Sequence, residues 1–194
     1  MSPFSAEDIH FIPQLRSTNQ LLAEQWKQEP GLSEACALVS FNQTAGRGQQ
    51  NNSWESEAGK NIAYSVFLRP VHINPNNSFV LSQAVSLATV ELLDTLNIKA
   101  SIKWPNDIYV QDKKIAGILI ENLIQGKSLL GCIAGIGLNV NQEHFTSDAP
   151  NPVSIVQLCG QNQDLHTLTL SLHRQIGAAY ADTCGFLQDA RLRQ

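Results

Sequence analysis

The stretch 103–121, KWPNDIYVQDKKIAGILIE, constrains the fold of this chain more than any other. Its two apolar runs, Asp107–Val110 and Lys114–Ile120, are separated by Gln111-Asp112, and this pattern predicts two short strands joined by a tight turn. Gly117 lies inside the second strand, where a glycine commonly marks a bulge or a ligand that approaches the backbone closely. The hairpin therefore predicts part of a sheet and gives a first indication of a site.

The spacing of apolar residues elsewhere predicts further strands and helices. Strands are expected over five ranges: Ile9–Ile12, Ala35–Phe41, Asn61–Arg69, Ile98–Trp104 and Leu129–Val140. Apolar residues alternate along residues 61–69, which is typical of a strand buried on one face. Helices are expected to begin at Ser17 or Thr18, at Ser78 and at Thr167. Together these elements predict one α+β domain over residues 1–194, with a mixed, largely antiparallel sheet and helices packed mainly on one face.

The composition places the chain among globular proteins and argues against several functional classes. Of the 194 residues, 43% are hydrophobic and 15% are charged, which is enough for one domain with a substantial core. The net charge of −4, without a basic block, argues against nucleic-acid binding. Because no signal peptide and no membrane-spanning apolar run is present, we expect a cytoplasmic protein without membrane contact.

Zinc and disulfide chemistry are also disfavoured. The cysteines form no CxxC pair and are expected to be reduced, mostly buried thiols: Cys36, Cys132, Cys159 and Cys184. The five histidines include no HExxH motif and no close His–Cys grouping, so we expect no zinc site.

Several polar residues have both a functional and a purely structural interpretation. Lys114, at the start of an apolar strand, is either a snorkelling side chain or, beside Gly117, a cation that holds a carboxylate or phosphate. Asn106 and Asp107 either form an Asx turn or act together with that cation. Arg47 lies in a Gly-Arg-Gly turn, which suits anion binding but is by itself a weak signal, since many surface turns have this form.

Combined, these motifs resemble a known family. KWPND followed by KKIAGIL resembles the core signature of the biotin protein ligases, which adenylate biotin and pass it to a lysine of a carrier protein. Gln43 and Trp54 stand at the spacing of the family's loop, which has the form GRGRxGRxW and follows a glutamine. Ser17-Thr18-Asn19 matches the family's S-T-N, which lies against the fused rings of biotin. The resemblance covers residues 17–141.

The loop after Arg47 departs from the family pattern. Residues 49–52 read Gln-Gln-Asn-Asn, where family members often have arginines and a second glycine. A desolvated charge-assisted hydrogen bond is worth about 1.5–3 kcal/mol, so we expect the acyl-adenylate to be held less tightly. Glutamine still donates hydrogen bonds, and we therefore interpret the loop as weakened rather than inactive.

The resemblance implies a role for each matching residue. Lys114 and Arg47 would be the catalytic cations. Biotin would be contacted by Ser17, Thr18, Asn19, Gln43, Arg47, Gly48, Gln49, Lys114 and Gly117. The nucleotide would be contacted by Trp54, Asn106, Asp107 and Asn139, with Trp54 either stacked on adenine or, alternatively, part of a core. Trp104 is predicted to be structural, and no metal ligand is assigned.

The implied activity is ATP-dependent biotinylation with Mg²⁺ as cofactor. The partner would be a biotin carboxyl carrier protein, such as a subunit of acetyl-CoA carboxylase, and the loop from Gln43 to Trp54 would close over the ligand. No helix-turn-helix and no small C-terminal domain is recognised, so we expect no repressor function. Either the chain is a minimal form of the family or it is shortened, and a shortened chain would ligate less well. A lipoate or octanoate ligase or transferase of the same fold, a non-catalytic biotin-binding protein, and a homodimer all stay open.

Overall fold

A single sheet forms the centre of the protein. The computed structural model describes residues 4–29, 31–49, 52–71, 73–146 and 151–191, with side chains described up to residue 183. In spatial order, the strands of this sheet are β1 (Ile9–Phe11), β2 (Ala37–Ser40), β5 (Ile62–Leu68), β9 (Ser128–Leu138), β8 (Lys113–Gln125), β7 (Asp107–Val110) and β6 (Ser101–Lys103). The β1–β2 pair is parallel and the other neighbours are antiparallel. A separate ribbon pairs β3 (Gly46–Arg47) with β4 (Ser53–Trp54).

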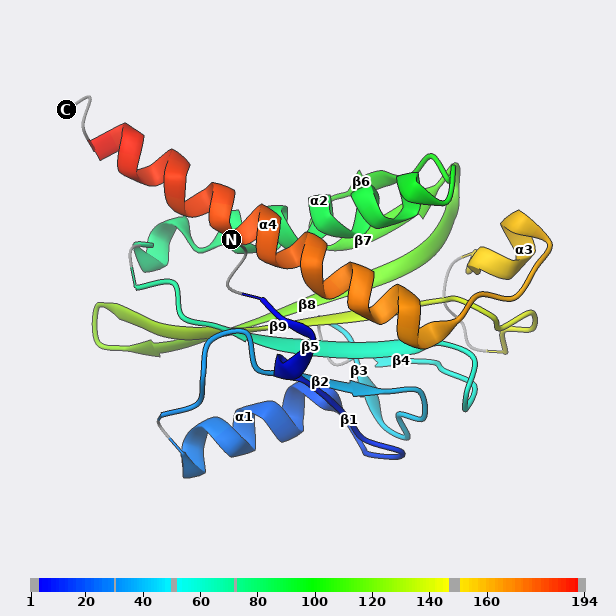
Figure 1. Ribbon diagram of the computed structural model, residues 1–194, viewed down its shortest axis with the longest axis horizontal. Coiled ribbons are helices and arrows are strands. Elements are labelled where there is room, and N and C mark those ends of the chain that lie inside the picture. Colours follow the sequence, from blue (N-terminus) through cyan, green and yellow to red (C-terminus); the bar gives the residue numbers. More distant parts are fainter. Residues whose placement is uncertain (1–3, 30, 50–51, 72, 147–150, 192–194) are drawn as a thin grey trace.

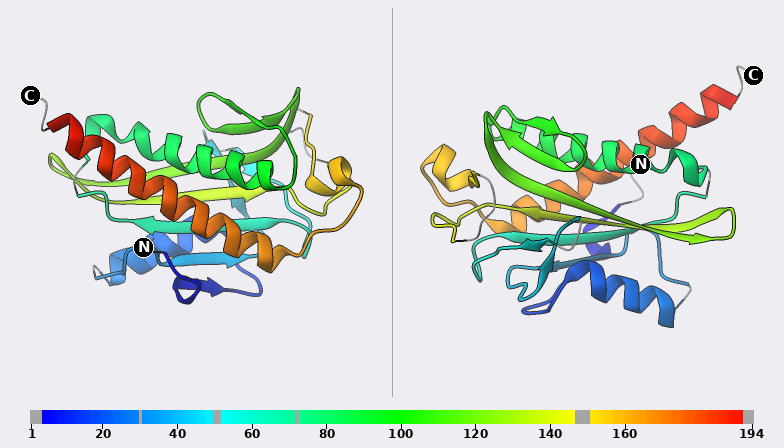
Figure 2. Two further views of the ribbon diagram at one scale, coloured as in Figure 1. Left: turned by 45° about the horizontal axis from the view of Figure 1, so that its top comes forward. Right: turned by 180° about the vertical axis from the view of Figure 1, so that it is seen from behind.

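Helices cover the two faces of the sheet unequally. The longer helices α2 (Phe79–Thr95) and α4 (Leu165–Arg191) pack against each other on one face (Figures 1 and 2). Helix α1 (Thr18–Gln28) lies on the opposite face (Figure 1). The short elements are the helix α3 (Ile155–Cys159) and the 3₁₀ helices η1 (Ala6–Asp8) and η3 (Pro75–Asn77). This arrangement confirms the predicted α+β class, the largely antiparallel sheet and the unequal distribution of helices.

Two apolar cores result from this layering. The larger core lies between the sheet and helices α2 and α4, and the smaller lies under α1 around Leu22, Leu38 and Phe67. Strand β5 contributes to both and is buried at every position. The prediction of a half-buried strand over residues 61–69 is therefore wrong, because α1 covers the face that was expected to meet solvent.

Most element boundaries follow the sequence pattern, and the exceptions have local causes. Strand β7 has the predicted bounds, whereas β8 continues to Gln125 along β9. Helix α4 begins before Thr167, because Asp164 Oδ1 accepts a hydrogen bond of 2.7 Å from Thr167 N. The hydrogen bonds from Thr167 also lower the pKa of the Asp164 carboxyl. Trp104 is 78% exposed and belongs to neither core, so its interpretation as a structural residue is wrong.

Among the described helices, none combines the length and the apolar character that crossing a bilayer requires.

A buried histidine lies at the contact between α4 and the sheet. His173 Nδ1 is 2.7 Å from the Tyr64 hydroxyl, and Nε2 is 4.0 Å from the nearer Asp8 oxygen. Burial, followed by the nearby Asp8 charge, raises the pKa of Tyr64 well above its usual value, so the phenol is the hydrogen-bond donor and Nδ1 the acceptor. Burial lowers the pKa of His173, although Asp8 and a Ser5 backbone hydrogen bond oppose the shift. The folded protein therefore holds this imidazole neutral.

This histidine makes stability dependent on pH. The unfolded chain takes up the His173 proton near pH 6.5 and the folded chain only at a lower pH, so stability is full above about pH 6.5 and falls as the pH drops. The loss is at most about 1.4 kcal/mol per pH unit. We expect His173→Gln to flatten the decline of the urea midpoint between pH 7.5 and 5.5. The exposed control His10→Gln should keep the parental slope, and an unchanged slope in His173→Gln would contradict the assignment.

Candidate active site

A cavity of about 260 Å³ opens on the α1 side of the sheet and is lined by six separate stretches of chain. Almost all of the residues that the sequence singled out line it: Ser17, Thr18, Asn19, Gln43, Arg47, Gly48, Gln49, Trp54, Asn106, Asp107, Lys114 and Gly117. The exception is Asn139. The fold thus brings together residues that lie up to 100 positions apart, while their roles toward a ligand stay predictions.

The floor of the cavity is bare backbone. Gly117 of β8 pairs with Gly137 of β9, and Gly135 lies two residues before Gly137 on the same strand. A Cβ atom on Gly135 would run into the Asn19 carboxamide, and one on Gly137 would run into the Trp54 indole. Because these glycines carry no side chain, both groups lie directly on the sheet.

Trp54 lies over this floor but in neither apolar core. It is half-buried, and its Nε1 is buried without a hydrogen-bond partner among the described residues. The Lys114 ammonium is 5.7 Å from the centroid of the ring. The alternative of a core tryptophan is therefore not realised, and stacking on a nucleotide base stays a prediction.

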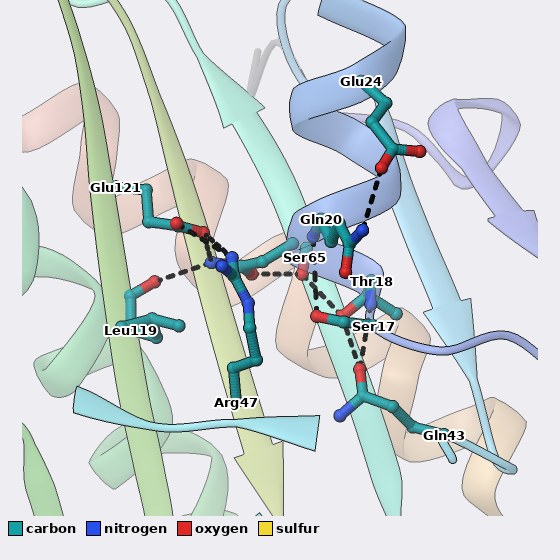
Figure 3. Close-up of polar contacts among 10 residues, drawn as sticks. Ser17, Thr18, Gln20, Glu24, Gln43, Arg47, Ser65, Leu119 and Glu121 are labelled. Carbon is teal, nitrogen blue, oxygen red and sulfur yellow. Dashed lines mark hydrogen bonds and ion pairs between the residues drawn. The ribbon is translucent and has the colours of Figure 1, made fainter. Parts of the chain in front are cut away.

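One end of the cavity is formed by the first turn of α1. Ser17 caps the helix by accepting a hydrogen bond of 3.4 Å from Gln20 N. Gln43 Oε1 accepts from Thr18 N at 2.9 Å and thereby satisfies a second free N–H group of the helix start (Figure 3). Capping and cavity lining thus coexist in these residues.

Asn19 and Arg47 meet at a carboxylate that the sequence reasoning did not select. Asn19 Nδ2 donates to Leu119 O at 3.2 Å and to Glu121 Oε2 at 2.8 Å. Arg47 Nη2 donates to both Glu121 oxygens, at 2.8 and 2.7 Å (Figure 3). One signal was available in the sequence, because Glu121 lies two and four residues from Leu119 and Gly117 and so shares their strand face.

The other end of the cavity holds the second ion pair. Lys114 Nζ is 2.7 Å from Asp107 Oδ1, and both side chains are about four-fifths buried. Asn106 lies beside them, but its Nδ2 donates to Ile118 O at 2.9 Å, and its own backbone oxygen accepts from Ile118 N. Asn106 therefore attaches the start of β7 to β8 in addition to lining the cavity.

Asn139 lies behind Lys114. It is buried, and its Nδ2 donates to Val153 O at 3.1 Å. It lines a separate cavity of about 50 Å³, which Trp54 and Lys114 also border. Its present contacts are structural, and its predicted role toward a nucleotide stays a prediction.

Both cavity cations are thus neutralised within the protein, Arg47 by Glu121 and Lys114 by Asp107. An anionic ligand must therefore compete with two carboxylates for these cations.

In the described part of the chain, no three metal-ligating side chains gather. Burial raises the pKa of Cys132 to about 12, so this thiol is no nucleophile at neutral pH. The geometry suits charge neutralisation and alignment of ligands.

Comparison with known proteins identifies the family of this chain. Residues 11–140 match the biotin/lipoate A/B protein ligase family. The chain is 33% identical to the bifunctional ligase/repressor BirA of Escherichia coli K12 over 173 residues, which cover 88% of this chain and 53% of that protein. It is also 33% identical to the biotin–[acetyl-CoA-carboxylase] ligase of Paracoccus denitrificans over 132 residues, or 65% of this chain and 53% of that protein. The chain therefore spans about half the length of these relatives.

Solved structures agree with the sequence matches. The biotin protein ligase of Aquifex aeolicus in complex with biotin and ATP superposes with a TM-score of 0.74 at 29% identity, covering 88% of this chain and 69% of that one. The Leishmania major enzyme in complex with biotinyl-5-AMP gives a TM-score of 0.71 at 25% identity, covering 87% and 73%. By sequence and by fold, this chain belongs to the biotin/lipoate A/B protein ligase family.

Proposed function

We propose that this chain is a biotin protein ligase. It activates biotin with ATP to form biotinyl-5′-AMP and transfers the biotinyl group to a lysine of a biotin carboxyl carrier protein. The observation that carries the proposal is the cavity itself, in which Ser17-Thr18-Asn19 lies at one end and the Lys114–Asp107 pair at the other. Relatives of this chain include a ligase solved with biotin and ATP, which supports the same pair of substrates.

The polarity of the cavity matches the two ends of biotin. The neutral ureido head needs hydrogen-bond donors and acceptors, which Thr18, Asn19 and Gln43 provide. The carboxylate needs a cation, and Lys114 is the buried cation at the far end. Between the two ends, Gly117 presents bare backbone to the cavity, and the Trp54 ring packs closely over it.

The first step joins two anions. An oxygen of the biotin carboxylate attacks the α-phosphorus of ATP, and the bond from that phosphorus to the pyrophosphate oxygen breaks. Lys114, released from Asp107 by the ligand, reduces the repulsion between the carboxylate and the phosphate and stabilises the charge that develops. Arg47 is paired with Glu121, and its predicted role as a second catalytic cation stays a prediction.

In the second step, the amine of the carrier lysine attacks the acyl carbon and AMP leaves. The protein supplies no nucleophile of its own. Closure of the loop from Gln43 to Trp54 over the cavity would keep water from the mixed anhydride.

Magnesium would arrive with ATP and be held mainly by phosphate oxygens, as is usual for this ion, so the ligands from the protein stay unassigned. The identity of the carrier, a homodimer and a cytoplasmic location stay predictions.

Intact mass spectrometry tests the proposal directly. Incubation with biotin, MgATP and a biotin carboxyl carrier domain should add the mass of one biotinyl group to the carrier. Lipoate in place of biotin should add none. When each acid is tested together with ATP, biotin should raise the melting temperature of the protein above its value with ATP alone and lipoate should not. Modification with lipoate alone would identify a lipoate ligase instead, while biotin binding without carrier labelling would indicate a non-catalytic binding protein.

We expect Lys114→Ala to lower biotin-dependent ATP–pyrophosphate exchange by at least about 10²-fold, because an electrostatic contact with the developing charge is lost. The fold should persist, since among the described residues the ammonium forms an ion pair with Asp107 at the end of the cavity and belongs to neither apolar core. The adjacent exposed Lys113→Ala removes the same charge outside the cavity and should exchange at the parental rate. Parental exchange by Lys114→Ala would exclude Lys114 from the chemistry.

Gln49→Arg should slow the loss of biotinyl-AMP to solvent. Gln49 lines the cavity, and an arginine there would add a charge-assisted hydrogen bond worth about 1.5–3 kcal/mol, or roughly 10–100-fold in release rate. Release can be followed after a single turnover by filtration. Gln161→Arg adds the same charge at an exposed position and should leave release unchanged. Equal release rates in parent and Gln49→Arg would show that the substitution in this family member is without effect.

A further inference from the structure

Glu121 lies just beyond the cavity and yet contacts two of its lining residues. It is on β8, and its side chain is one-third exposed. Its carboxylate accepts one hydrogen bond from Asn19 and two from Arg47. Figure 3 shows Glu121 beside Leu119, with Arg47 reaching toward it from the short strand β3. One carboxylate therefore connects the helix start, the loop and the sheet.

These contacts determine which way the Asn19 amide faces. An amide nitrogen has two protons, and those of Asn19 go to Leu119 O and to Glu121 Oε2. Leu119 O and Glu121 Oε2 can only accept hydrogen bonds. If the Asn19 amide were flipped, its oxygen would face these two acceptors and both hydrogen bonds would be lost. Asn19 Oδ1 consequently faces Ser65 Oγ at 2.5 Å and retains a second lone pair. Because Asn19 also lies against Gly135, the group has little freedom to tilt.

The direction of this amide matters for a ureido ligand. A ureido group has two N–H donors and one carbonyl acceptor, so an oxygen and a nitrogen at the same position of the cavity have opposite effects on it. With Asn19 Oδ1 fixed in place, an N–H group of the ligand finds an acceptor. A flipped Asn19 amide would instead place its own N–H against the N–H of the ligand, and no hydrogen bond could form. Arg47, held by the same carboxylate, supplies donors next to this acceptor.

We propose that Glu121 is a positioning residue for the polar head of the substrate. It holds Asn19 with its oxygen available as an acceptor and holds Arg47 beside it, without contacting the reacting atoms at Lys114. This inference rests on the proposed function, since it takes biotin as the ligand. It predicts that Glu121 affects biotin binding selectively and leaves the chemical step and ATP binding unchanged.

The test compares Glu121→Gln and Glu121→Ala with Glu24→Gln. Glu24 also accepts a hydrogen bond from an amide, that of Gln20 at 2.9 Å, but it lies on the exposed side of α1 outside the cavity (Figure 3). For each variant, the Kd for biotin is measured by calorimetry without ATP, the melting temperature without ligand, and kcat and KM for both substrates in pyrophosphate exchange. The glutamine variant keeps one acceptor oxygen but loses the charge.

We expect the Kd for biotin to rise about 10-fold in Glu121→Gln and up to about 100-fold in Glu121→Ala, as for the loss of hydrogen bonds to a charged group. The kcat at saturating biotin, the KM for ATP and all values for Glu24→Gln should stay within about twofold of the parent. An unchanged Kd in Glu121→Ala would overturn the proposal. So would parallel losses for biotin and ATP with a lowered melting temperature, which indicate a merely structural role. A parent protein that binds no biotin would refute the proposed function and the ligand assigned to this position.

Discussion

The close approach of side chains to the sheet backbone at Gly135 and Gly137 is the constraint on which the cavity depends. A methyl group at either position would collide with Asn19 or Trp54. Both of these residues come from segments outside the sheet, so the collision would push α1 and the β3–β4 ribbon away from β8 and β9. The depth of the cavity is therefore set by the absence of side chains on two strands.

The second organising feature is the pairing of each cavity cation with a carboxylate. Arg47 and Lys114 would repel each other and attract solvent if left alone, and Glu121 and Asp107 neutralise them. Partly buried ion pairs of this kind add little net stability, because desolvation offsets most of the attraction. We interpret the two pairs as functional, since an anionic ligand can exchange with a carboxylate at modest net cost. The two pairs lie at different ends of the cavity, so under the proposed function one would orient the neutral head of biotin and the other would meet its anionic end.

Sequence reasoning identified the lining residues through motifs, and its errors share one cause. The burial of both faces of β5 and the exposure of Trp104 depend on what packs against each element, which local periodicity does not contain. Glu121 was missed for a related reason, because a carboxylate at the end of an apolar strand is typical of a solvated terminus. Its role emerges only when Asn19, 102 positions earlier, lies beside it.

Local sequence patterns were sufficient to predict the hairpin, the helix start at Ser17, the residues that line the cavity and the resemblance to a family. These properties are local, since they depend on turn residues, capping hydroxyls and motifs within a few positions. Three features became visible in the folded protein alone: which cation pairs with which carboxylate, which way the Asn19 amide faces, and the position of Asn139 behind Lys114 rather than in the main cavity. These contacts depend on distances between side chains of separate elements, and those distances are established only when the sheet and its helices pack.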